Sequence, residues 1–327
     1  MRRFTRQLLV FLLMILSIGK LYAFDCRGVF YADNDVFGKT DRFYTSGLIY
    51  EEECAVPKDE VSSWDYKGYL LGQMMFTPSK LNQEIPREND RPYADLFIAG
   101  MSFYKVSHNR RSGYRYYIGN IGASSGGNTQ QKGAHAFFRS IKRIRTGFGD
   151  AADDPAGWDH QIVLYEPVVG VRYDSLTYYH DRRVALGYNF EFGTAFINGG
   201  LALHFQLYEI DHRVFVPNEY SWNMYFNFSV KGIIFDATLE GSRYYLNSQN
   251  MDFALTKDQI NPLIRRNEIG FKWNLFRYSS FHLSFIREDP AVRYIEDPGL
   301  ISKPPKDWIN ELTSSQRYGR MTFEHYF

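Results

Sequence analysis

Apolar and polar residues alternate with a period of two over the last part of the chain. Met321 and Phe323 fall on one face of this stretch, Arg320 and Glu324 fall on the other, and the final residue is Phe327. Successive side chains of a β-strand point to opposite faces, so the pattern predicts a strand with one apolar face. A strand of membrane-spanning length that ends on an aromatic residue is typical of the closing strand of an outer-membrane barrel. The alternative is an ordinary amphipathic edge strand.

Similar segments recur along the chain and are separated by turn residues. An even number of antiparallel strands can close into a transmembrane β-barrel, in which short periplasmic turns alternate with longer extracellular loops. If the first strand begins in the periplasm, residues 122–160 form the longest extracellular loop and residues 196–200 the shortest. The twelve predicted strands cover residues 27–35, 43–53, 64–76, 96–106, 114–121, 161–173, 183–195, 201–210, 222–235, 263–276, 281–288 and 316–327.

The longest predicted loop contains a helical pattern. Residues 130–145 place Ala134, Phe137 and Ile141 at helical spacing, contain no proline and carry basic residues toward their end. This spacing predicts a short helix. We therefore expect an all-β fold: a twelve-stranded antiparallel transmembrane β-barrel with a short helix in a long extracellular loop.

The start of the chain has the pattern of a secretory signal peptide. Arg2, Arg3 and Arg6 precede a short apolar run, and Leu21-Tyr22-Ala23 resembles a cleavage site. The run is too short to cross a bilayer as a helix, and no later stretch has about 18 consecutive apolar residues. We expect residues 1–23 to be a signal peptide and residues 24–327 to form one barrel domain.

Composition favours an exported β-protein. Aromatic residues make up 17% of the chain, with 27 Phe and 25 Tyr, which fits the apolar surface and aromatic girdles of a membrane barrel. A secreted β-sandwich is the alternative. The 38 basic and 37 acidic residues nearly balance, so the chain has no strong net positive charge that would attract nucleic acid, and no nucleic-acid partner is expected. Cys26 and Cys54 are the two cysteines, and we expect them to pair in an oxidising compartment.

A dense polar cluster lies at the tip of the first predicted hairpin, over residues 33–47. Cys26 and Cys54 are symmetric about residue 40, as are Asp35 and Thr45, so a hairpin in this register would set Asp35 opposite Thr45. The alternative is a polar loop whose side chains form Asx-turns.

The same tip is rich in hard oxygen donors of the kind that Ca²⁺ prefers. Phe37 and Tyr44 occupy positions where an EF-hand needs ligands, so a calcium site here would draw on separate segments. The donors are Asp33, Asn34, Asp35 and Asp41.

One histidine is a candidate general base. His135 lies on the predicted loop helix, with Gln131 one turn earlier on the same face. A lone helix histidine is more often structural or exposed than catalytic, but this one is expected above the carboxylate-rich hairpin. Residues 122–126 match G-x-S-x-G, yet that nucleophile elbow needs alternating strands and helices, which this chain lacks. A serine nucleophile is therefore the weaker hypothesis.

Several motifs, in this order, resemble the outer-membrane lipid A 3'-O-deacylase family over about residues 30 to 327. The closing segment, with Tyr318-Gly319 and Phe327, fits the same family. The motifs are Asn34-Asp35, Thr40-Asp41-Arg42-Phe43-Tyr44-Thr45-Ser46-Gly47-Leu48, Asp90-Arg91-Pro92-Tyr93-Ala94, Gln131-x-x-x-His135 and Gly157-Trp158-Asp159-His160-Gln161.

The resemblance implies a twelve-stranded barrel and calcium-dependent hydrolysis of the ester that carries the 3'-linked acyloxyacyl group of lipid A. It makes His135 the general base that activates water, and Asn34, Asp35 and Thr45 active-site residues on the first hairpin. Asp35 is also the expected ligand of Ca²⁺, the implied cofactor. A calcium ion held by oxygen ligands can stabilise the oxyanion of ester hydrolysis without a serine nucleophile.

Substrate contacts are expected from Lys80, Arg91 and Gln131. Family members carry a basic pair in the second extracellular loop, where this chain reads Ser79-Lys80-Leu81-Asn82, so Lys80 matches at most one of the two. The resemblance further implies a bacterial outer-membrane location and a lipopolysaccharide substrate in the outer leaflet, and we expect a monomer. The rival hypotheses are a barrel that acts as a channel or binding protein, and an outer-membrane phospholipase.

Overall fold

The computed structural model describes residues 26–34, 43–57, 60, 62–79, 85, 90–133, 157–163, 165–180, 182–207, 222–242, 253–276, 278–293 and 314–326.

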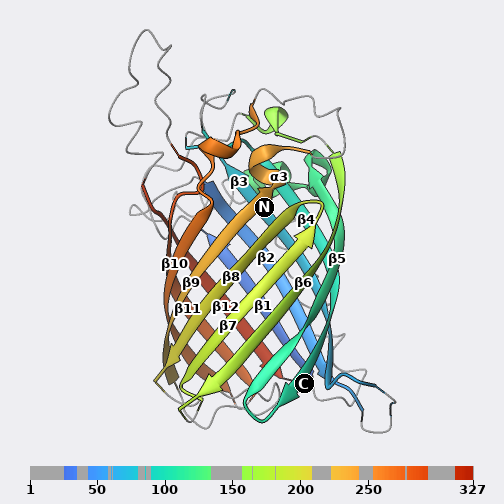
Figure 1. Ribbon diagram of the computed structural model, residues 1–327, viewed down its shortest axis with the longest axis vertical. Helices are drawn as coiled ribbons and strands as arrows, with labels where there is room; N and C mark the ends of the chain where they lie inside the picture. Colours follow the sequence, from blue (N-terminus) through green and yellow to red (C-terminus); the bar gives the residue numbers. More distant parts are fainter. Residues whose placement is uncertain are drawn as a thin grey trace.

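Twelve antiparallel strands in the described part of the chain close into a barrel (Figure 1). Each strand pairs with its neighbours in sequence, and β1 pairs with β12 to close the sheet. The predicted fold class and strand number are thus confirmed. The strands are β1 (Cys26–Asn34), β2 (Phe43–Ala55), β3 (Tyr66–Thr77), β4 (Ala94–Ser107), β5 (Arg110–Gly122), β6 (Tyr165–Tyr179), β7 (Val184–Gly193), β8 (Phe196–Gln206), β9 (Trp222–Asp236), β10 (Leu263–Phe276), β11 (Ser279–Glu288) and β12 (Gln316–Tyr326).

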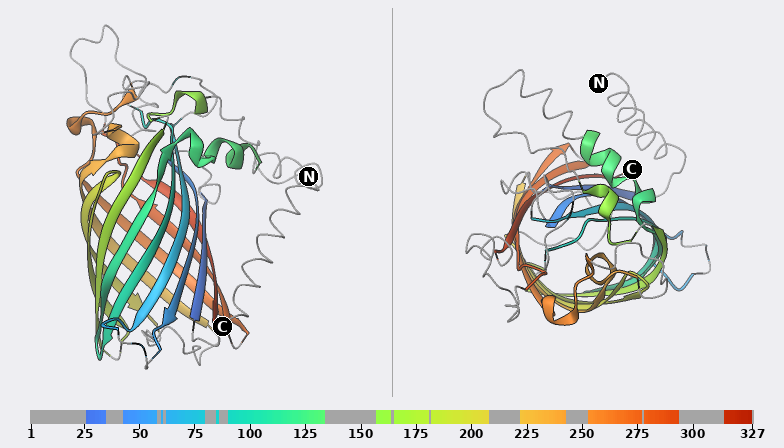
Figure 2. Two further views of the ribbon diagram at one scale, coloured as in Figure 1. Left: turned by 90° about the vertical axis from the view of Figure 1, so that its right-hand side faces the viewer. Right: turned by 90° about the horizontal axis from the view of Figure 1, so that it is seen from above.

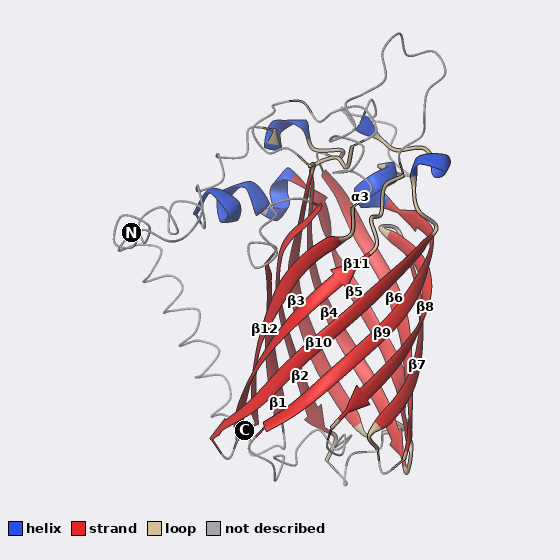
Figure 3. Ribbon diagram, turned by 90° about the vertical axis from the view of Figure 1, so that its left-hand side faces the viewer, coloured by secondary structure: helices blue, strands red, loops and turns tan. Residues whose placement is uncertain are grey.

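We call the end of the barrel where β1 finishes and β2 begins the loop end, and the opposite end the turn end. The helical segments within the described residues all lie at the loop end (Figure 3). They are short: η2 (Ala123–Ser125), residues 127–133, η3 (Trp158–His160), α3 (Ala237–Glu240) and η5 (Lys257–Gln259). Within these described segments, none is long and apolar enough to cross a membrane as a helix.

One predicted loop is wrong, because β8 begins at Phe196 and takes up residues 196–200. Neighbouring glycines such as Gly199 and Gly200 often mark a turn, but here Gly199 pairs with Phe190 of β7. A Cβ at Gly199 would lie 3.0 Å from the Phe190 ring, so the glycine makes room for an aromatic side chain on the neighbouring strand. Glycine inside a strand often marks such a close approach.

The two faces of the barrel wall differ in chemistry. Toward the lumen, Glu53 pairs with Arg111 at 2.6 Å, and Glu324 pairs with Lys272 at 2.7 Å and with Arg27 at 3.2 Å. The outward face is apolar, and an apolar exterior around a polar interior is typical of a membrane-spanning barrel. Exposed outward side chains include Tyr69, Met101, Ile118, Tyr165, Phe190, Phe192, Leu201, Ile269, Phe285, Met321 and Phe323.

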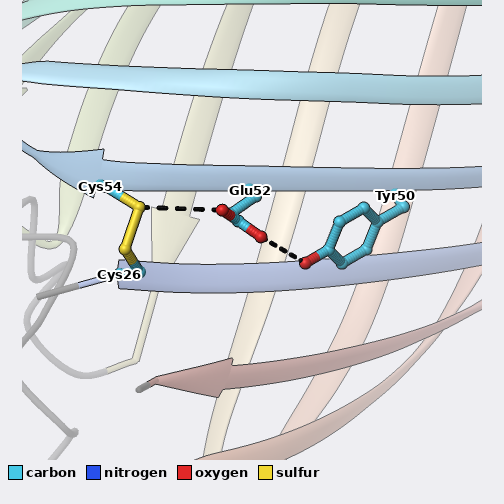
Figure 4. Close-up of a disulfide and its surroundings, with 4 residues drawn as sticks. All are labelled: Cys26, Tyr50, Glu52 and Cys54. Atoms are coloured by element: carbon cyan, nitrogen blue, oxygen red, sulfur yellow. Dashed lines mark hydrogen bonds between the residues drawn. A yellow bond between two sulfur atoms is a disulfide. The ribbon is translucent and has the colours of Figure 1, made fainter. Parts of the chain in front are cut away.

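A disulfide joins β1 to β2 at the turn end (Figure 4). Cys26 and Cys54 are direct cross-strand partners, which confirms the predicted pairing of the two cysteines. Glu52 lies beside the bridge, with Oε1 3.9 Å from the Cys54 sulfur, and accepts a hydrogen bond of 2.8 Å from the Tyr50 hydroxyl. Since a disulfide sulfur carries no hydrogen, the approach of Glu52 to the Cys54 sulfur is a contact and not a hydrogen bond. The bridge fixes the register of the first hairpin from its base.

Candidate functional site

The first hairpin keeps its register up to the loop end. The β1–β2 pairing runs without a break from Cys26 opposite Cys54 to Asn34 opposite Ser46. This confirms the predicted register as far as the strands are described, while Asp35 lies outside the described residues. Between β2 and β3 the register shifts at Tyr44 and Ser46, so the backbone of Thr45 lies at a β-bulge without a paired residue on β3. A bulge of this kind locally bends the strand and redirects its side chains.

Neighbouring residues of β1 point to opposite faces of the wall. Asp33 faces the lumen, where Arg320 donates two hydrogen bonds to its carboxylate at 2.6 and 2.7 Å and Tyr44 donates a third at 3.0 Å. Asn34 therefore lies on the outward face, the same face as the exposed Leu48 of β2. Because its oxygens are engaged by Arg320 and Tyr44, Asp33 is not free to hold a metal ion.

The start of the loop helix is fixed to the outward face of the wall. Asp95 shares the outward face of β4 with the exposed Met101, and its carboxylate accepts a hydrogen bond from the backbone N–H of Gly127. On the neighbouring strand, Gln73 donates a hydrogen bond of 2.6 Å to the carbonyl of Ser125. Seen from above, the helical segment lies outside the ring of strands (Figure 2).

The helical residues 127–133 confirm part of the predicted helix, and the rest of residues 130–145 lies outside the described residues. A carboxylate at a helix N-terminus satisfies an N–H group that has no partner inside the helix and complements the helix dipole. Asp95 is fully buried, because the helix start covers it. The contact thus sets where the helix of residues 127–133 starts on the barrel wall. His135 itself lies outside the described residues.

Three of the sequence motifs meet beside this helix. Gln131 is buried, and its Oε1 accepts a hydrogen bond of 2.7 Å from the indole N–H of Trp158. The Trp158 ring packs against Tyr93 with centroids 5.1 Å apart, and Met75 completes a small buried cluster. The backbone N–H of Ile162 donates to the carbonyl of Tyr93. Gln131 therefore ties the helix to both loops, and its expected contact with substrate stays a prediction.

Arg91 is buried at the mouth of the barrel. One NH2 group donates a hydrogen bond of 2.6 Å to Thr238 Oγ1 of α3, and the guanidinium lies 4.2 Å above the Phe76 ring. Burial lowers the pKa of Arg91 to about 10, against the opposite effect of the Asp236 carboxylate, so the side chain stays charged at neutral pH. These contacts give Arg91 a bridging position between two loops. Its role as a substrate contact stays a prediction, and Lys80 lies outside the described residues.

The described residues offer few candidates for a metal site. Among the described residues, one group of three side chains that could bind a metal lies close together: Cys26, Glu52 and Cys54. Both cysteines of this group form the disulfide, so they are not available as ligands. Asn128, the second residue of the loop helix, carries a buried Oδ1 with no hydrogen-bond partner. An uncommitted amide oxygen is a donor that suits Ca²⁺. The expected ligand, Asp35, lies outside the described residues, so the calcium hypothesis stays a prediction.

Sequence reasoning missed two parts of this arrangement. Asp95 directly follows the motif that ends at Ala94, and its position next to that motif was the available signal. The Asp33–Arg320 pair joins residues 287 positions apart, so only the barrel closure between β1 and β12 brings them together.

Replacing Asp95 by alanine is expected to loosen the start of the loop helix. The variant loses the buried hydrogen bond from the Gly127 N–H to the Asp95 carboxylate, which stabilises the helix start by about 1–2 kcal/mol. Backbone amide exchange over residues 123–133 should therefore rise about tenfold. Hydrogen exchange followed by mass spectrometry measures this directly. Asp95→Asn keeps an acceptor and should stay close to the native protein.

Asp65 provides a matched control for this experiment, because its carboxylate accepts a hydrogen bond of 2.7 Å from the backbone N–H of Val106 at the turn end. Asp65→Ala should raise exchange near Val106 and leave residues 123–133 unchanged. Unchanged exchange over residues 123–133 in Asp95→Ala would show that Asp95 does not hold the helix.

Comparison with protein families gives one match, to the outer membrane protein LpxR, over residues 8–288. A search of curated proteins finds no match to this chain.

Among solved structures, LpxR from Salmonella typhimurium is similar, with a TM-score of 0.63 and 14% identity, covering 92% of this chain and 100% of that one. The β domain of the Bordetella autotransporter BrkA has a TM-score of 0.38 at 8% identity, covering 93% of this chain and 99% of that one. The NanC porin has a TM-score of 0.36 at 8% identity, with the same coverage. At 14% identity, the first likeness supports the barrel fold.

Proposed function

The chain belongs to the family of the outer membrane protein LpxR, and from this membership we infer that it is a hydrolase that removes the 3'-linked acyloxyacyl chain of lipid A. Membership makes it a bacterial outer-membrane protein, so the loop end with its longer connections faces the cell exterior. The lipid A of the outer leaflet is then the lipid that surrounds this end of the barrel.

One observation carries the proposal: the loop helix is anchored on the outward face of the wall. Asp95 and Gln73 hold its start there, and Asn34 lies on the same outward face two strands away from Gln73. A water-soluble substrate that moved through the lumen would need its site inside the barrel. A site between the helix and the outward face is open to a lipid that lies in the membrane.

In the proposed mechanism, His135 removes a proton from the water that attacks the ester carbonyl, and returns this proton to the sugar oxygen as the ester C–O bond breaks. Asn34, Asp35 and Thr45 line the hairpin side of the site, and Asp35 would hold a calcium ion. When bound, Ca²⁺ would supply positive charge near the developing oxyanion. The buried bond between Gln131 and Trp158 fixes the helix turn that precedes His135. Rigid support of this kind keeps a base in reach of its water.

The filled lumen favours an enzyme over a channel. Toward the turn end, Arg111 of β5 pairs with Glu53 of β2, and Lys272 of β10 pairs with Glu324 of β12, so these ion pairs join strands that are not neighbours. At the loop end the Tyr44 ring packs against Phe76 and Tyr318, with centroids 5.5 and 5.2 Å apart. The lumen also contains a cavity of about 420 Å³, lined mainly by polar and charged side chains. Large side chains on both sides of this cavity obstruct a continuous water-filled path.

The proposal is tested by mass spectrometry of lipid A. Purified full-length protein in detergent should convert hexa-acylated lipid A to a product that lacks the 3'-linked acyloxyacyl group. EGTA should abolish the conversion, Ca²⁺ should restore it and Mg²⁺ should not, because a site of carboxylate and amide oxygens with flexible geometry selects Ca²⁺.

Unchanged lipid A in the presence of Ca²⁺, with a folded barrel confirmed by its heat-dependent gel mobility, would contradict the deacylase proposal. Conversion that persists in EGTA would remove calcium from the mechanism. Release of fatty acid from glycerophospholipids instead of lipid A would favour the phospholipase.

A further inference from the structure

Two basic residues lie close together on the outward face at the turn end, and we call them the turn-end pair. Lys105 near the end of β4 and Arg110 at the start of β5 are both exposed. Lys105 shares its face of β4 with the exposed Met101. Arg110 shares its face of β5 with the exposed Tyr114. Lys105 pairs in register with Ser112, two positions after Arg110, so the side chains of the pair start about 7–8 Å apart as diagonal neighbours.

Neutral hydroxyl groups hold the guanidinium of Arg110 in place. Its Nε donates a hydrogen bond of 3.0 Å to the hydroxyl of Ser175. One terminal NH2 group donates to the hydroxyls of Tyr173 and Tyr188, at 3.2 and 2.9 Å. The other terminal NH2 group has no hydrogen-bond partner among the described residues. Arg110 is therefore oriented by the barrel wall and keeps N–H donors for an anion.

Within the described part of the chain, no carboxylate neutralises either member of the turn-end pair. Asp65 lies beside the end of β4, but its carboxylate accepts a hydrogen bond of 2.7 Å from a backbone N–H and forms no ion pair with Lys105. Arg111, the next residue of β5, faces the lumen and pairs with Glu53 at 2.6 Å. The turn-end pair thus sets two like charges side by side, an arrangement that destabilises the sheet unless an anion lies between them.

Aromatic rings form a continuous layer on the loop-end side of the pair. The ring centroids of Tyr114 and Tyr173 lie 5.0 Å apart, and those of Tyr173 and Tyr188 lie 5.9 Å apart. The rings of this layer are Phe103, Tyr114, Tyr116, Tyr173, Tyr188 and Phe190. Such a layer is typical of the interface between membrane and water. The pair lies between this layer and the turns, at the height where a lipid carries its phosphate group.

The opposite wall has aromatic residues at the turn end without such cations. Trp222 of β9 pairs in register with Trp273 of β10, and the rings of Trp222 and Phe271 stack with centroids 5.5 Å apart. No described outward residue at the turn end of β9 or β10 is basic. The aromatic layer itself needs no cation, so the turn-end pair marks a local site on β4 and β5.

The position of the pair determines which ligand it meets. In an outer-membrane barrel the turn end faces the periplasm, so outward side chains there contact the periplasmic leaflet, which consists of glycerophospholipids. A zwitterionic headgroup carries an ammonium group beside its phosphate, and the pair offers no carboxylate to bind that group. An anionic headgroup compensates the two positive charges and leaves no charge of its own without a partner.

We propose that Lys105 and Arg110 bind the phosphate group of an anionic glycerophospholipid of the periplasmic leaflet, such as phosphatidylglycerol. The free NH2 group of Arg110 donates to a phosphate oxygen, and the Lys105 ammonium adds a second positive charge. The bound lipid fixes the depth of the barrel at its periplasmic rim. The site lies in the opposite leaflet from the proposed deacylation, so this inference does not rest on the proposed function.

The test is native mass spectrometry of the full-length protein in detergent, titrated with phosphatidylglycerol or with phosphatidylethanolamine. The Kd for phosphatidylglycerol should rise about tenfold or more in Lys105→Gln/Arg110→Gln, because hydrogen bonds to a charged group are lost. The Kd for phosphatidylethanolamine should change less than about twofold. Higher ionic strength should weaken the binding of phosphatidylglycerol to the native protein more than to the variant.

Three further variants accompany the double variant. Tyr173→Phe/Tyr188→Phe keeps both rings and removes the hydroxyls that orient Arg110, and should raise the Kd for phosphatidylglycerol about threefold. Arg265→Gln removes an outward arginine at the loop end that is neutralised by Asp289, and should leave this Kd unchanged. Trp273→Leu removes a ring from the opposite wall and should also leave it unchanged.

An equal Kd for phosphatidylglycerol in the native protein and the double variant, with a folded barrel confirmed by heat-dependent gel mobility, would overturn the inference. An equally large loss of phosphatidylethanolamine binding would overturn the assignment to an anionic headgroup. A dimer in the native spectrum that disappears in the double variant would assign the surface to a second copy of the chain instead. Deacylation of lipid A in detergent should be unchanged in the double variant, so the lipid site and the proposed function can fail separately.

Discussion

Replacing His135 by alanine is expected to lower the rate of lipid A 3'-deacylation by about 10³-fold. A positioned general base contributes roughly 10²–10⁴-fold to a hydrolytic rate, and no other residue of the proposed site can take the proton from water equally well at neutral pH. The measurement is a single-turnover assay with purified protein, in which the deacylated product is quantified by mass spectrometry. Substrate binding should remain within about twofold of the native value, since alanine removes the base and leaves the expected substrate contacts in place.

The control for this variant is His108→Ala. His108 is exposed in the turn between β4 and β5 at the turn end, so its loss should leave the rate unchanged. A His135→Ala rate within about tenfold of the native one, from a barrel that folds normally, would contradict the assignment of His135 as the base. The Asp95→Ala variant provides an intermediate case, because it should loosen the helix start without removing the imidazole.

The strand pattern and the first hairpin were predictable because the physics behind them is local. Side chains of a barrel point alternately toward lipid and toward the lumen, so apolar and polar residues alternate with a period of two in the sequence of each strand. The register of β1 and β2 followed from the symmetric positions of Cys26 and Cys54. The β8 start was missed because Gly199 and Gly200 resemble a turn when the aromatic partner on the next strand is not known.

The anchoring of the site was much less predictable. The bond between Trp158 and Gln131 and the bond between Asp95 and Gly127 join different loops, so no local pattern marks them. Arg91 illustrates the same limit. Its motif indicates a charged residue in a loop, but its partner Thr238 is 147 positions away, and only the closed barrel shows that the side chain points into the mouth.

Removing the lumenal partner of Asp33 is expected to have the largest effect on stability. Arg320→Ala leaves a buried carboxylate, 2% exposed, without the two hydrogen bonds at 2.6 and 2.7 Å. Breaking a buried ion pair in this way costs about 3–5 kcal/mol of unfolding free energy. Urea unfolding of the barrel in lipid vesicles, followed by tryptophan fluorescence, measures this loss. The matched control is Arg265→Ala, whose ion pair with Asp289 is 65% exposed on the arginine side and should contribute at most about 1 kcal/mol.

The double variant Asp33→Asn/Arg320→Gln separates charge from packing. Two neutral amides can keep a hydrogen bond across β1 and β12 without an unpaired charge, so this variant should recover most of the stability lost in Arg320→Ala. If the double variant regains stability, the loss in Arg320→Ala comes from the unpaired, buried carboxylate of Asp33. If the two variants lose the same unfolding free energy, the loss comes from the missing packing of the arginine side chain. Because Asp33 directly precedes Asn34, a stable double variant also tests the site. Deacylation at the native rate would mean that the Asp33–Arg320 ion pair has a structural role only, in which it holds β1 and the first hairpin against β12.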